Sequence, residues 1–262
     1  MDNIKEKVRK FWNNSPCGTR GIKIQTETKD FFEEVERKRY ALEPFLSGYV
    51  QFERWKNKKG LEVGCGVGTD FLQFLRAGVD MYGIDLSEES VSLAKKRLSL
   101  YGFDSNRLAV GDCEALTFQD NSFDFVYSWG VLHHTANIEN AISEIWRVVK
   151  PGGEICIMLY NKISLVALQL YILHGLLKLN LFRDINEIIA NHLESPGTKA
   201  FTKKEIEKLF TNFSDLKITT IVTRYDLRYK RDKDKNDSFL PGWVGRFIPG
   251  MFGWYHIIKG KK

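Results

Sequence analysis

The sequence predicts an α/β fold, a mostly parallel sheet with helices on both faces. Two observations predict it. Between residues 59 and 160, short apolar segments that fit strands alternate five times with segments of helical periodicity. A glycine turn separates the first strand from the first helix. Because strand–helix–strand units join parallel strands by right-handed crossovers, we expect ligands to bind at the carboxyl ends of the strands.

The glycine turn lies between a strand at 61–63 and a helix that begins near Phe71. Gly64, Gly66 and Gly68 occupy every second position of this turn. Glycine allows positive φ angles and lets the backbone approach a ligand closely, since no Cβ intervenes. The helix that follows directs its free N–H groups and the positive end of its dipole toward the same place. The turn therefore predicts a ligand site.

Two acids beside the turn indicate the kind of ligand. Asp85 ends the second strand, 79–85, where a carboxylate can accept both hydroxyls of a ribose. Glu62 precedes the turn, where a carboxylate would repel a pyrophosphate and suits a cation. The spacing G-x-G-x-G also differs from the G-x-G-x-x-G of dinucleotide sites. S-adenosylmethionine fits these features, because it carries an ammonium and a sulfonium and no phosphate.

The remaining elements up to residue 160 follow from capping and turn signals. Ser87 is an N-cap for a helix at 88–100, and a third strand is expected at 108–110. A fourth strand at 123–127 precedes a helix at 137–149, which we expect to stop at Pro151-Gly152-Gly153. A fifth strand is expected at 154–159. Four polar side chains then fall at carboxyl ends of strands: Glu62, Asp85, Asp112 and Ser128.

Four segments together resemble the successive motifs of class I S-adenosylmethionine-dependent methyltransferases: LEVGCGVGTD, GIDLS, GDCEALTFQDNSFDFVYSWGVLHH and RVVKPGG. The type 11 group, related to the ubiquinone and menaquinone methyltransferases, is the most similar. The resemblance covers residues 58–160. It implies a Rossmann-like sheet of seven strands, with a sixth at 216–225 and an antiparallel seventh at 254–258.

The resemblance also implies S-adenosyl-L-methionine as the cofactor, with no metal. It implies that Asp112 binds the adenine amino group and that the next backbone N–H reaches the ring. Tyr40 could cover the methionine end of the cofactor or simply pack in its helix. The cofactor-binding residues implied in this way are Glu62, Gly64, Cys65, Gly66, Gly68, Asp85, Leu86, Asp112, Cys113, Ser128 and Tyr40.

His133 and His134 follow the fourth strand and are the candidate catalytic residues, as general bases. Alternatively, one of them only bonds the backbone of this loop. We expect methyl transfer to a small-molecule or lipid-like acceptor, at oxygen. N- or C-methylation of a small natural product and a non-catalytic cofactor-binding partner subunit are the alternatives. The Arg-Asn pair typical of quinone methyltransferases is absent here, which disfavours a quinone ring as acceptor.

We expect residues 1–57 to form an N-terminal helical cap and residues 58–262 to form the methyltransferase domain. The cofactor half of that domain is residues 58–160, and its substrate-side helices and last strands are residues 161–262. The cap is expected to contain helices at 2–12 and 30–45, the latter capped by Asp30. Residues 163–182 form an apolar stretch that is barely long enough to cross a bilayer and is interrupted by polar residues. Thr202 and Glu205 predict a capping box, and residues 228–249 form an insertion of basic and aromatic residues before the last strand.

Charge is distributed unevenly along the 262 residues. Residues 61–160 contain 7 Lys and Arg against 14 Asp and Glu, whereas residues 161–262 contain 18 against 10. Basic flanks suit an anionic partner, and with the apolar stretches they predict peripheral membrane contact; the alternative is a buried helix and a lid over a soluble substrate.

No Asp/Asn-Pro-Pro-Tyr sequence follows the fourth strand, so nucleic acid is not expected as a partner. The charged first ten residues and four scattered cysteines predict a cytoplasmic protein with free thiols, in the cytosol or at a membrane surface. The oligomeric state stays open.

Overall fold

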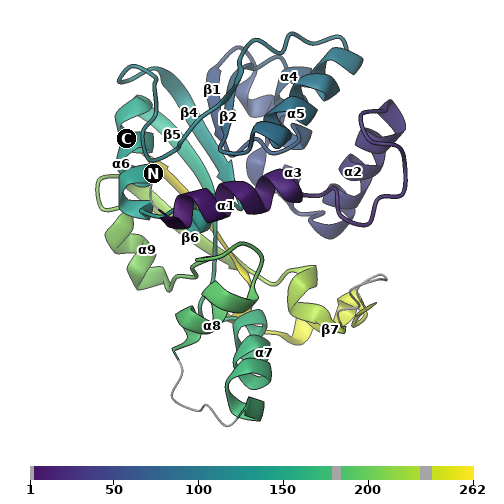
Figure 1. Ribbon diagram of the computed structural model, residues 1–262. Coiled ribbons are helices and arrows are strands. Elements are labelled where there is room, and N and C mark those ends of the chain that lie inside the picture. The colour runs from purple at the N-terminus through teal and green to yellow at the C-terminus, as the bar shows by residue number, and fades with distance from the viewer. Residues whose placement is uncertain (1–2, 179–183, 231–237) are drawn as a thin grey trace.

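The computed structural model describes residues 3–178, 184–230 and 238–262 (Figure 1). Its centre is one seven-stranded sheet in the order β3-β2-β1-β4-β5-β9-β6. The strands of this sheet are β1 (Lys59–Val63), β2 (Asp80–Asp85), β3 (Leu108–Val110), β4 (Phe123–Trp129), β5 (Val149–Tyr160), β6 (Ser214–Ile221) and β9 (Tyr255–Lys261). The helices are α1 (Asn3–Asn14), α2 (Lys29–Leu42), α3 (Leu46–Val50), α4 (Thr69–Arg76), α5 (Glu88–Leu100), α6 (Ile138–Val148), α7 (Leu165–His174), α8 (Ile185–His192) and α9 (Lys203–Leu209).

Short 3₁₀ turns and a small hairpin complete the described residues. The hairpin pairs β7 (Arg228–Lys230) with β8 (Ser238–Phe239). The 3₁₀ turns are η1 (Phe52–Trp55), η2 (Leu132–His134), η3 (Leu176–Lys178), η4 (Arg224–Leu227), η5 (Gly242–Phe247) and η6 (Gly250–Phe252).

The pairing of the strands confirms the predicted Rossmann-like class. β1 lies parallel to both β2 and β4, and β4 lies parallel to β5. β9 lies antiparallel between β5 and β6, as expected for the seventh strand. The carboxyl ends of β1, β2, β3 and β4 therefore meet at one edge of the sheet, where ligands of parallel sheets bind.

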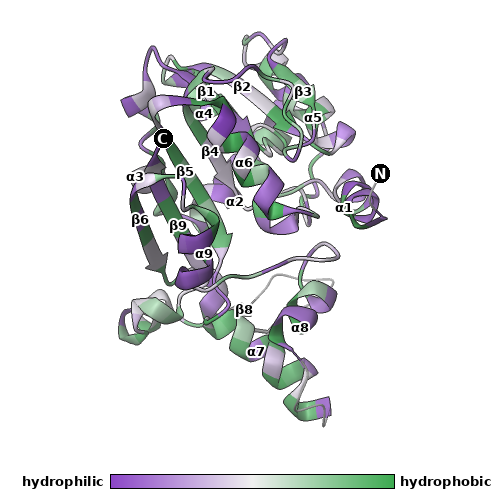
Figure 2. Cartoon of the chain, turned by 90° about the vertical axis from the view of Figure 1, so that its left-hand side faces the viewer, coloured by the Kyte–Doolittle hydropathy of each residue, from purple (hydrophilic) through white to green (hydrophobic). Residues whose placement is uncertain are grey.

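Alternation along the central strands places a hydrophobic core on each face of the sheet. In β5, Cys156 and Met158 belong to one buried cluster, whereas Ile155 and Ile157 belong to the other. Both faces are covered, so the central strands are apolar at consecutive positions (Figure 2). This explains why they appear in the sequence as short apolar runs.

Several predicted boundaries differ from the structure. The N-cap of α2 is Thr28, whose hydroxyl accepts the N–H of Phe31, and not Asp30, which lies inside the helix. α6 ends at Val148, before Pro151, because the chain passes at Val149 directly into β5. β6 covers Ser214–Ile221, so its start and end lie earlier than predicted.

The apolar stretch 163–182 forms neither one long helix nor a simple crossover helix. α7 ends at His174 and η3 follows, because Gly175 interrupts the helix, while residues 179–182 lie outside the described residues. Within the described ranges, no helix is long and apolar enough to cross a membrane. Residues 231–237 of the predicted insertion also lie outside the description.

His256 makes the stability of this fold depend on pH. Its ring is 1% exposed on β9, and its Nδ1 lies 2.9 Å from the Thr220 hydroxyl. Burial lowers the pKa of His256 to about 4. The unfolded chain binds this proton near pH 6.5, so the contribution is complete above pH 6.5 and is lost as the pH falls toward 4.

We expect acidification from pH 7 to 4.5 to cost the native protein about 2–3 kcal/mol through this residue. His256→Gln, which can keep the bond to Thr220, should remove that part of the pH dependence. Urea unfolding of both proteins at the two pH values measures it. Parallel losses of stability in the two proteins would show that His256 does not titrate in this way.

Candidate active site

The glycine turn opens toward free space at the carboxyl edge of the sheet. Gly64, Gly66 and Gly68 all have positive φ, at 80°, 52° and 74°. The N–H groups of Gly64 and Cys65 donate to the carbonyl of Ile84 at 2.8 and 2.9 Å, which ties the turn to β2. A Cβ placed on Gly66 would meet no atom within 4 Å. The space in front of Gly66 is therefore available for a ligand that approaches the backbone.

Asp85 lies beside this turn, as predicted. Its carboxylate accepts the N–H of Gly66 at 2.8 Å and the N–H of Ser87 at 2.9 Å. Burial raises the pKa of Asp85, although these backbone donors oppose the shift. Leu86, half-buried, follows it directly. Each oxygen of Asp85 is an acceptor with more than one lone pair, so the carboxylate can also receive ribose hydroxyls.

Asp112 lies at the end of β3 and is already engaged by the N-terminal helix. Lys5 of α1 donates to its Oδ2 at 2.6 Å and also lies 3.0 Å from Glu114. Half-buried Cys113 connects the two acids. The second acid of the predicted site therefore has a cation from the cap as its partner, and α1 crosses the carboxyl edge of the sheet (Figure 1).

Ser128 is completely buried and acts between strands. Its hydroxyl donates to the carbonyl of Val63 at 2.9 Å, which holds the ends of β4 and β1 together. Because Val63 directly precedes Gly64, this bond fixes the start of the glycine turn.

Glu62 is a buried acid with an unused oxygen. It is 4% exposed, and its Oε2 has no hydrogen-bond partner within the described part of the chain. Burial, together with the nearby Asp70 carboxylate, holds the pKa of Glu62 well above its usual range. An orphaned carboxylate oxygen is unfavourable unless a donor or a cation meets it. With the open space at Gly66, this fits a cationic cofactor such as S-adenosylmethionine.

A buried network that the motif analysis did not identify surrounds Asp70. Its carboxylate accepts Arg39 at 2.7 Å, the Tyr127 hydroxyl at 2.8 Å and the Tyr40 hydroxyl at 3.0 Å. Burial opposes ionisation here, but Arg39 outweighs it and lowers the pKa of Asp70. Tyr40 thus joins the site through its hydroxyl.

A second acid, Glu43, extends this network. It accepts Arg39 at 2.9 Å, the Trp129 indole N–H at 2.8 Å and the Tyr255 hydroxyl at 2.9 Å. In the sequence, a lone acid near the end of a predicted helix resembles a solvated surface residue, so no local signal marks Glu43. Arg39 therefore bridges two buried carboxylates and fixes α2 against the edge of the sheet.

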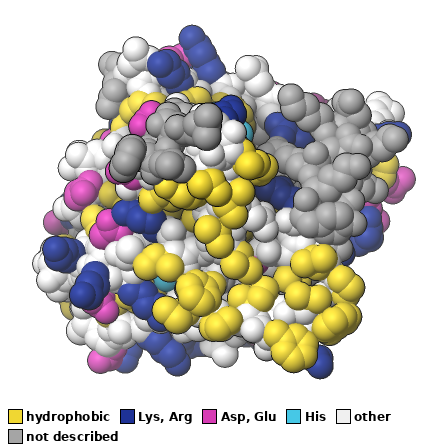
Figure 3. Space-filling view, turned by 90° about the horizontal axis from the view of Figure 1, so that it is seen from below, with side chains coloured by type: hydrophobic (Ala, Val, Ile, Leu, Met, Phe, Trp, Pro, Cys, Tyr) yellow, Lys and Arg dark blue, Asp and Glu magenta, His cyan; other side chains and the backbone are white. Residues whose placement is uncertain are grey.

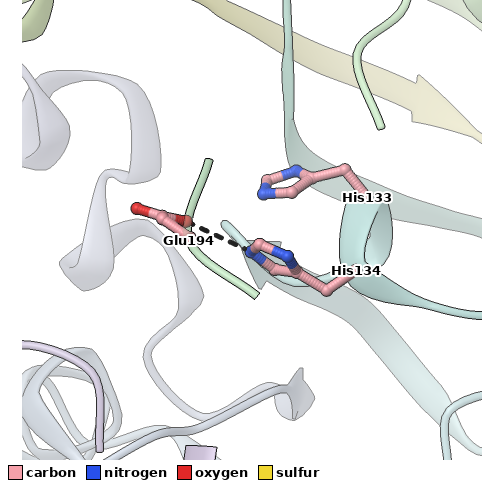
Figure 4. Close-up of side chains that lie close together, drawn as sticks. All are labelled: His133, His134 and Glu194. Carbon is pink, nitrogen blue, oxygen red and sulfur yellow. Dashed lines mark ion pairs between the residues drawn. The ribbon is translucent and has the colours of Figure 1, made fainter. Parts of the chain in front are cut away.

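His133 and His134 differ sharply in their surroundings (Figure 4). His133 is completely buried, and its ring stacks on Tyr160 at 3.7 Å between centroids. Burial holds the pKa of His133 well below its usual range, so it stays neutral. Neither of its ring nitrogens has a hydrogen-bond partner among the described residues.

His134 is held in one orientation by a segment far away in the sequence. Its Nδ1 lies 2.8 Å from the Ser195 hydroxyl and 3.0 Å from the Thr198 hydroxyl. The Thr198 hydroxyl donates to the carbonyl of Ser195 at 2.6 Å, so it must accept from Nδ1–H. In the neutral ring this leaves the lone pair on Nε2.

The Nε2 of His134 faces Glu194. The carboxylate Oε2 lies 3.4 Å from it (Figure 4). The same oxygen also accepts the hydroxyl of Tyr160 at 2.9 Å. A carboxylate at this distance can stabilise positive charge that forms on the imidazole when Nε2 accepts a proton.

The loop after α1 reaches the same place. Protein surrounds the thiol of Cys17, although part of the side chain meets solvent, and this burial raises its pKa to about 12. Glu194, Arg39, Glu43 and Asp85 are the charged groups that act on the thiol. Cys17 is therefore near enough to Glu194 and to the Arg39–Glu43 pair for their charges to act on its thiol. All four cysteines of the chain are free, and burial raises the pKa of each, so none offers a thiolate at neutral pH.

Asp85→Ala is expected to weaken binding of S-adenosylhomocysteine, the demethylated cofactor, by about 1–3 kcal/mol, because charge-assisted hydrogen bonds to the ribose are lost. Isothermal titration calorimetry measures the change. Ser87→Ala is the matched control, since it removes the N-cap of α5 beside Asp85 without touching the carboxylate. Equal affinity of the Asp85 variant and the unaltered protein would exclude Asp85 from the cofactor site.

Comparisons with known proteins agree with this geometry. Residues 61–157 match a family model described as a methyltransferase domain. Over 103 residues the chain is 34% identical to phosphoethanolamine N-methyltransferase 2 of Caenorhabditis elegans, covering 39% of this chain and 24% of that protein. It is 25% identical over 160 residues to demethylmenaquinone methyltransferase of Bacillus cytotoxicus, covering 55% of this chain and 67% of that protein.

Among solved structures, geranyl diphosphate C-methyltransferase from Streptomyces coelicolor shares the fold with a TM-score of 0.63 and 16% identity, covering 99% of this chain and 98% of that one. That structure contains S-adenosyl-L-homocysteine. The chain spans about a quarter to a third of the length of the first curated relatives it matches. The motifs, the sheet order and these matches identify residues 61–157 as a methyltransferase domain of the class I type, with S-adenosylmethionine as its cofactor.

Proposed function

We propose that the protein transfers a methyl group from S-adenosylmethionine to an oxygen of a small-molecule or lipid-like acceptor. The observation that carries this proposal is the His134–Glu194 pair, an oriented proton acceptor on the loop that adjoins the glycine turn. That loop is close, because a Cβ on Gly64 would overlap the side chain of Val131. The alternative role for the histidines, bonding the loop backbone, has no support from the ring nitrogens of either residue.

When bound, the cofactor supplies an electrophilic methyl group on a sulfonium. Glu62, Gly66 and Asp85 would hold it at the carboxyl edge, and Asp112 would meet its adenine. The acceptor hydroxyl loses its proton to Nε2 of His134 as its oxygen forms the new bond to carbon, and the broken carbon–sulfur bond leaves its electron pair on sulfur. Glu194 stabilises the imidazolium, while the remaining contribution is proximity and orientation.

We propose His134 as the catalytic base and His133 as a positioning residue. Stacked on Tyr160, His133 fixes the phenol whose hydroxyl donates to Glu194. Residues 1–57 would act as a cap, since Lys5 of α1 contacts Asp112 while Trp12 packs edge-on against His134 at 5.3 Å. No metal is needed for this chemistry.

A second candidate is methylation at nitrogen or carbon. The relatives' names include an N-methyltransferase and C-methyltransferases of sterols, which supports keeping this candidate. Tyr160 also stacks on Trp254 at 4.2 Å and on Tyr255 at 5.9 Å, which gives the site an aromatic wall suited to a cationic or planar acceptor. A non-catalytic cofactor-binding subunit would need no oriented His134.

The experiment is incubation of the purified full-length chain with cell extract and methyl-deuterated S-adenosylmethionine, followed by untargeted mass spectrometry. We expect one labelled product of an apolar hydroxyl compound, with the label on oxygen. A labelled amine or carbon skeleton would favour the second candidate. Cofactor binding without any labelled product would favour the non-catalytic subunit. We place the protein in the cytoplasm, with its acceptor drawn from a membrane surface.

A further inference from the structure

One end of the molecule exposes an unusual amount of apolar surface. Among the described residues, thirteen large hydrophobic side chains are exposed, and ten of these lie in two segments, 163–177 and 240–251. Phe247 is 79% exposed, Leu177 68% and Trp243 61%. A soluble protein rarely leaves so many large apolar side chains together without a partner.

The two segments lie on the same end of the fold. η4 contacts both α7 and η5, and α7, α8 and the β7–β8 hairpin extend from one end of the sheet (Figure 1). Seen from that end, hydrophobic side chains gather across the surface with basic side chains near them (Figure 3). We call residues 163–177 and 240–251 the apolar end.

The two segments and their immediate flanks carry charges of one sign. Neither 162–178 nor 238–251 contains an Asp or a Glu, whereas Lys178 and Arg246 are exposed. The last part of the chain, 161–262, is also strongly basic, in contrast to the acidic cofactor half. An apolar surface with cations and aromatic side chains at its margin complements an anionic bilayer, because apolar groups insert while cations meet the head groups.

The apolar end also adjoins the proposed reacting groups. α8 packs on α7, and the segment that follows α8 carries Glu194. In η4, Tyr225 lies near Tyr255, at 6.1 Å between ring centroids, and the Tyr255 hydroxyl donates to Glu43 of the buried network. α8 and η4, which pack against the apolar end, therefore connect it to residues of the candidate site.

We infer that the apolar end docks onto an anionic lipid bilayer, with Trp243 and Phe247 inserted at the level of the head groups. This inference rests on the proposed function only in that a membrane would supply its lipid-like acceptor. Docking itself needs neither cofactor nor turnover. An acceptor could then pass from the bilayer to His134 without crossing water.

The test is sedimentation of the full-length protein with vesicles of phosphatidylcholine alone or with one third phosphatidylglycerol, at 50 and 500 mM salt, without cofactor. We expect binding to the anionic vesicles that falls with salt. Arg246→Gln should weaken binding about fivefold, as expected for one basic residue at the surface. Trp243→Ala with Phe247→Ala should weaken it by about tenfold or more, because two inserted aromatic side chains are lost.

Leu100→Ala is the matched control, since Leu100 is an exposed apolar residue (40%) of α5, outside the apolar end, and should leave binding unchanged. Circular dichroism of every variant confirms folding. A wild-type protein that stays in the supernatant at 50 mM salt overturns the inference. A dimer that Trp243→Ala with Phe247→Ala converts to a monomer would also overturn it, because a second copy would then cover the apolar end. Vesicle binding without any methylated product would contradict only the proposed function.

Discussion

Gly64→Ala is expected to lower the free energy of unfolding by about 2–5 kcal/mol. Two costs add at this position. Its φ of 80° is unfavourable for a residue with a Cβ, by about 1–2 kcal/mol. The new methyl group would also overlap Val131, whose own Cβ would lie at 2.9 Å, and overpacking of this kind costs about 1–3 kcal/mol. Urea denaturation monitored by tryptophan fluorescence measures the loss.

Two other glycines separate these costs. Gly102 has a φ of 76° and nothing within 4 Å of an added Cβ, so Gly102→Ala should show the backbone cost alone. Gly66 has a φ of 52° and the same open surroundings, but its Cβ would enter the space assigned to the cofactor. We expect Gly66→Ala to unfold like Gly102→Ala and yet to bind S-adenosylhomocysteine at least about tenfold more weakly.

The opposite pattern would refute this assignment. If Gly66→Ala keeps full affinity, the cofactor does not approach that part of the turn. If Gly64→Ala is no less stable than Gly102→Ala, then Val131 moves aside readily and the loop that carries His134 is not fixed by the glycine turn.

Most of the cofactor half of the fold could be predicted from the sequence, because boundaries such as those of α5 have a local cause. Ser87 caps α5 by accepting the N–H of Ser90, and both ends of α5 lie where the sequence predicts them. The capping box of Thr202 and Glu205 at α9 is likewise present. Local hydrogen bonds of this kind involve residues three positions apart, so the amino-acid pattern alone reveals them.

Elements that depend on distant contacts were predicted less well. α7 is apolar almost all around, so its periodicity did not show where it would end. The prediction of Asp30 as the N-cap of α2 is wrong, because Thr28 and Asp30 are both good N-caps and only the backbone conformation distinguishes them.

Of the residues in the proposed proton-accepting group, only the two histidines could be predicted from the sequence. The two histidines stand out because they follow a strand, whereas Glu194, Ser195 and Thr198 lie about sixty residues downstream in a segment rich in turn residues. Their role depends on the tertiary arrangement that brings this segment to the end of β4. In the sequence, Glu194-Ser195-Pro196-Gly197 resembles an ordinary surface turn, so no local pattern indicates that this segment belongs to the site.

His134→Ala is expected to reduce turnover by about 10²–10⁴-fold while affinity for S-adenosylhomocysteine is retained, since in the proposed mechanism the ring takes the proton of the acceptor and does not hold the cofactor. The assay is single-turnover methylation of the acceptor identified by mass spectrometry, with calorimetry for cofactor affinity. Both readouts are needed, because a variant that merely unfolds would lose both.

Glu194→Gln tests the other half of the pair. The amide keeps the size of the side chain and can still accept the hydroxyl of Tyr160, but it cannot stabilise the imidazolium. We expect a smaller loss of turnover than for His134→Ala, because the imidazole can still accept the proton while the charge that forms on it no longer has a carboxylate beside it.

The two substitutions act on one proton acceptor, so their effects should not add. The double variant is expected to be about as slow as His134→Ala alone, since Glu194 acts only through the imidazole that is already missing. If instead the losses multiply, Glu194 contributes through a different route, for instance by contacting the acceptor directly. Full activity in His134→Ala would mean that proximity and orientation alone drive the transfer, as they can when an acceptor reaches the site already ionised.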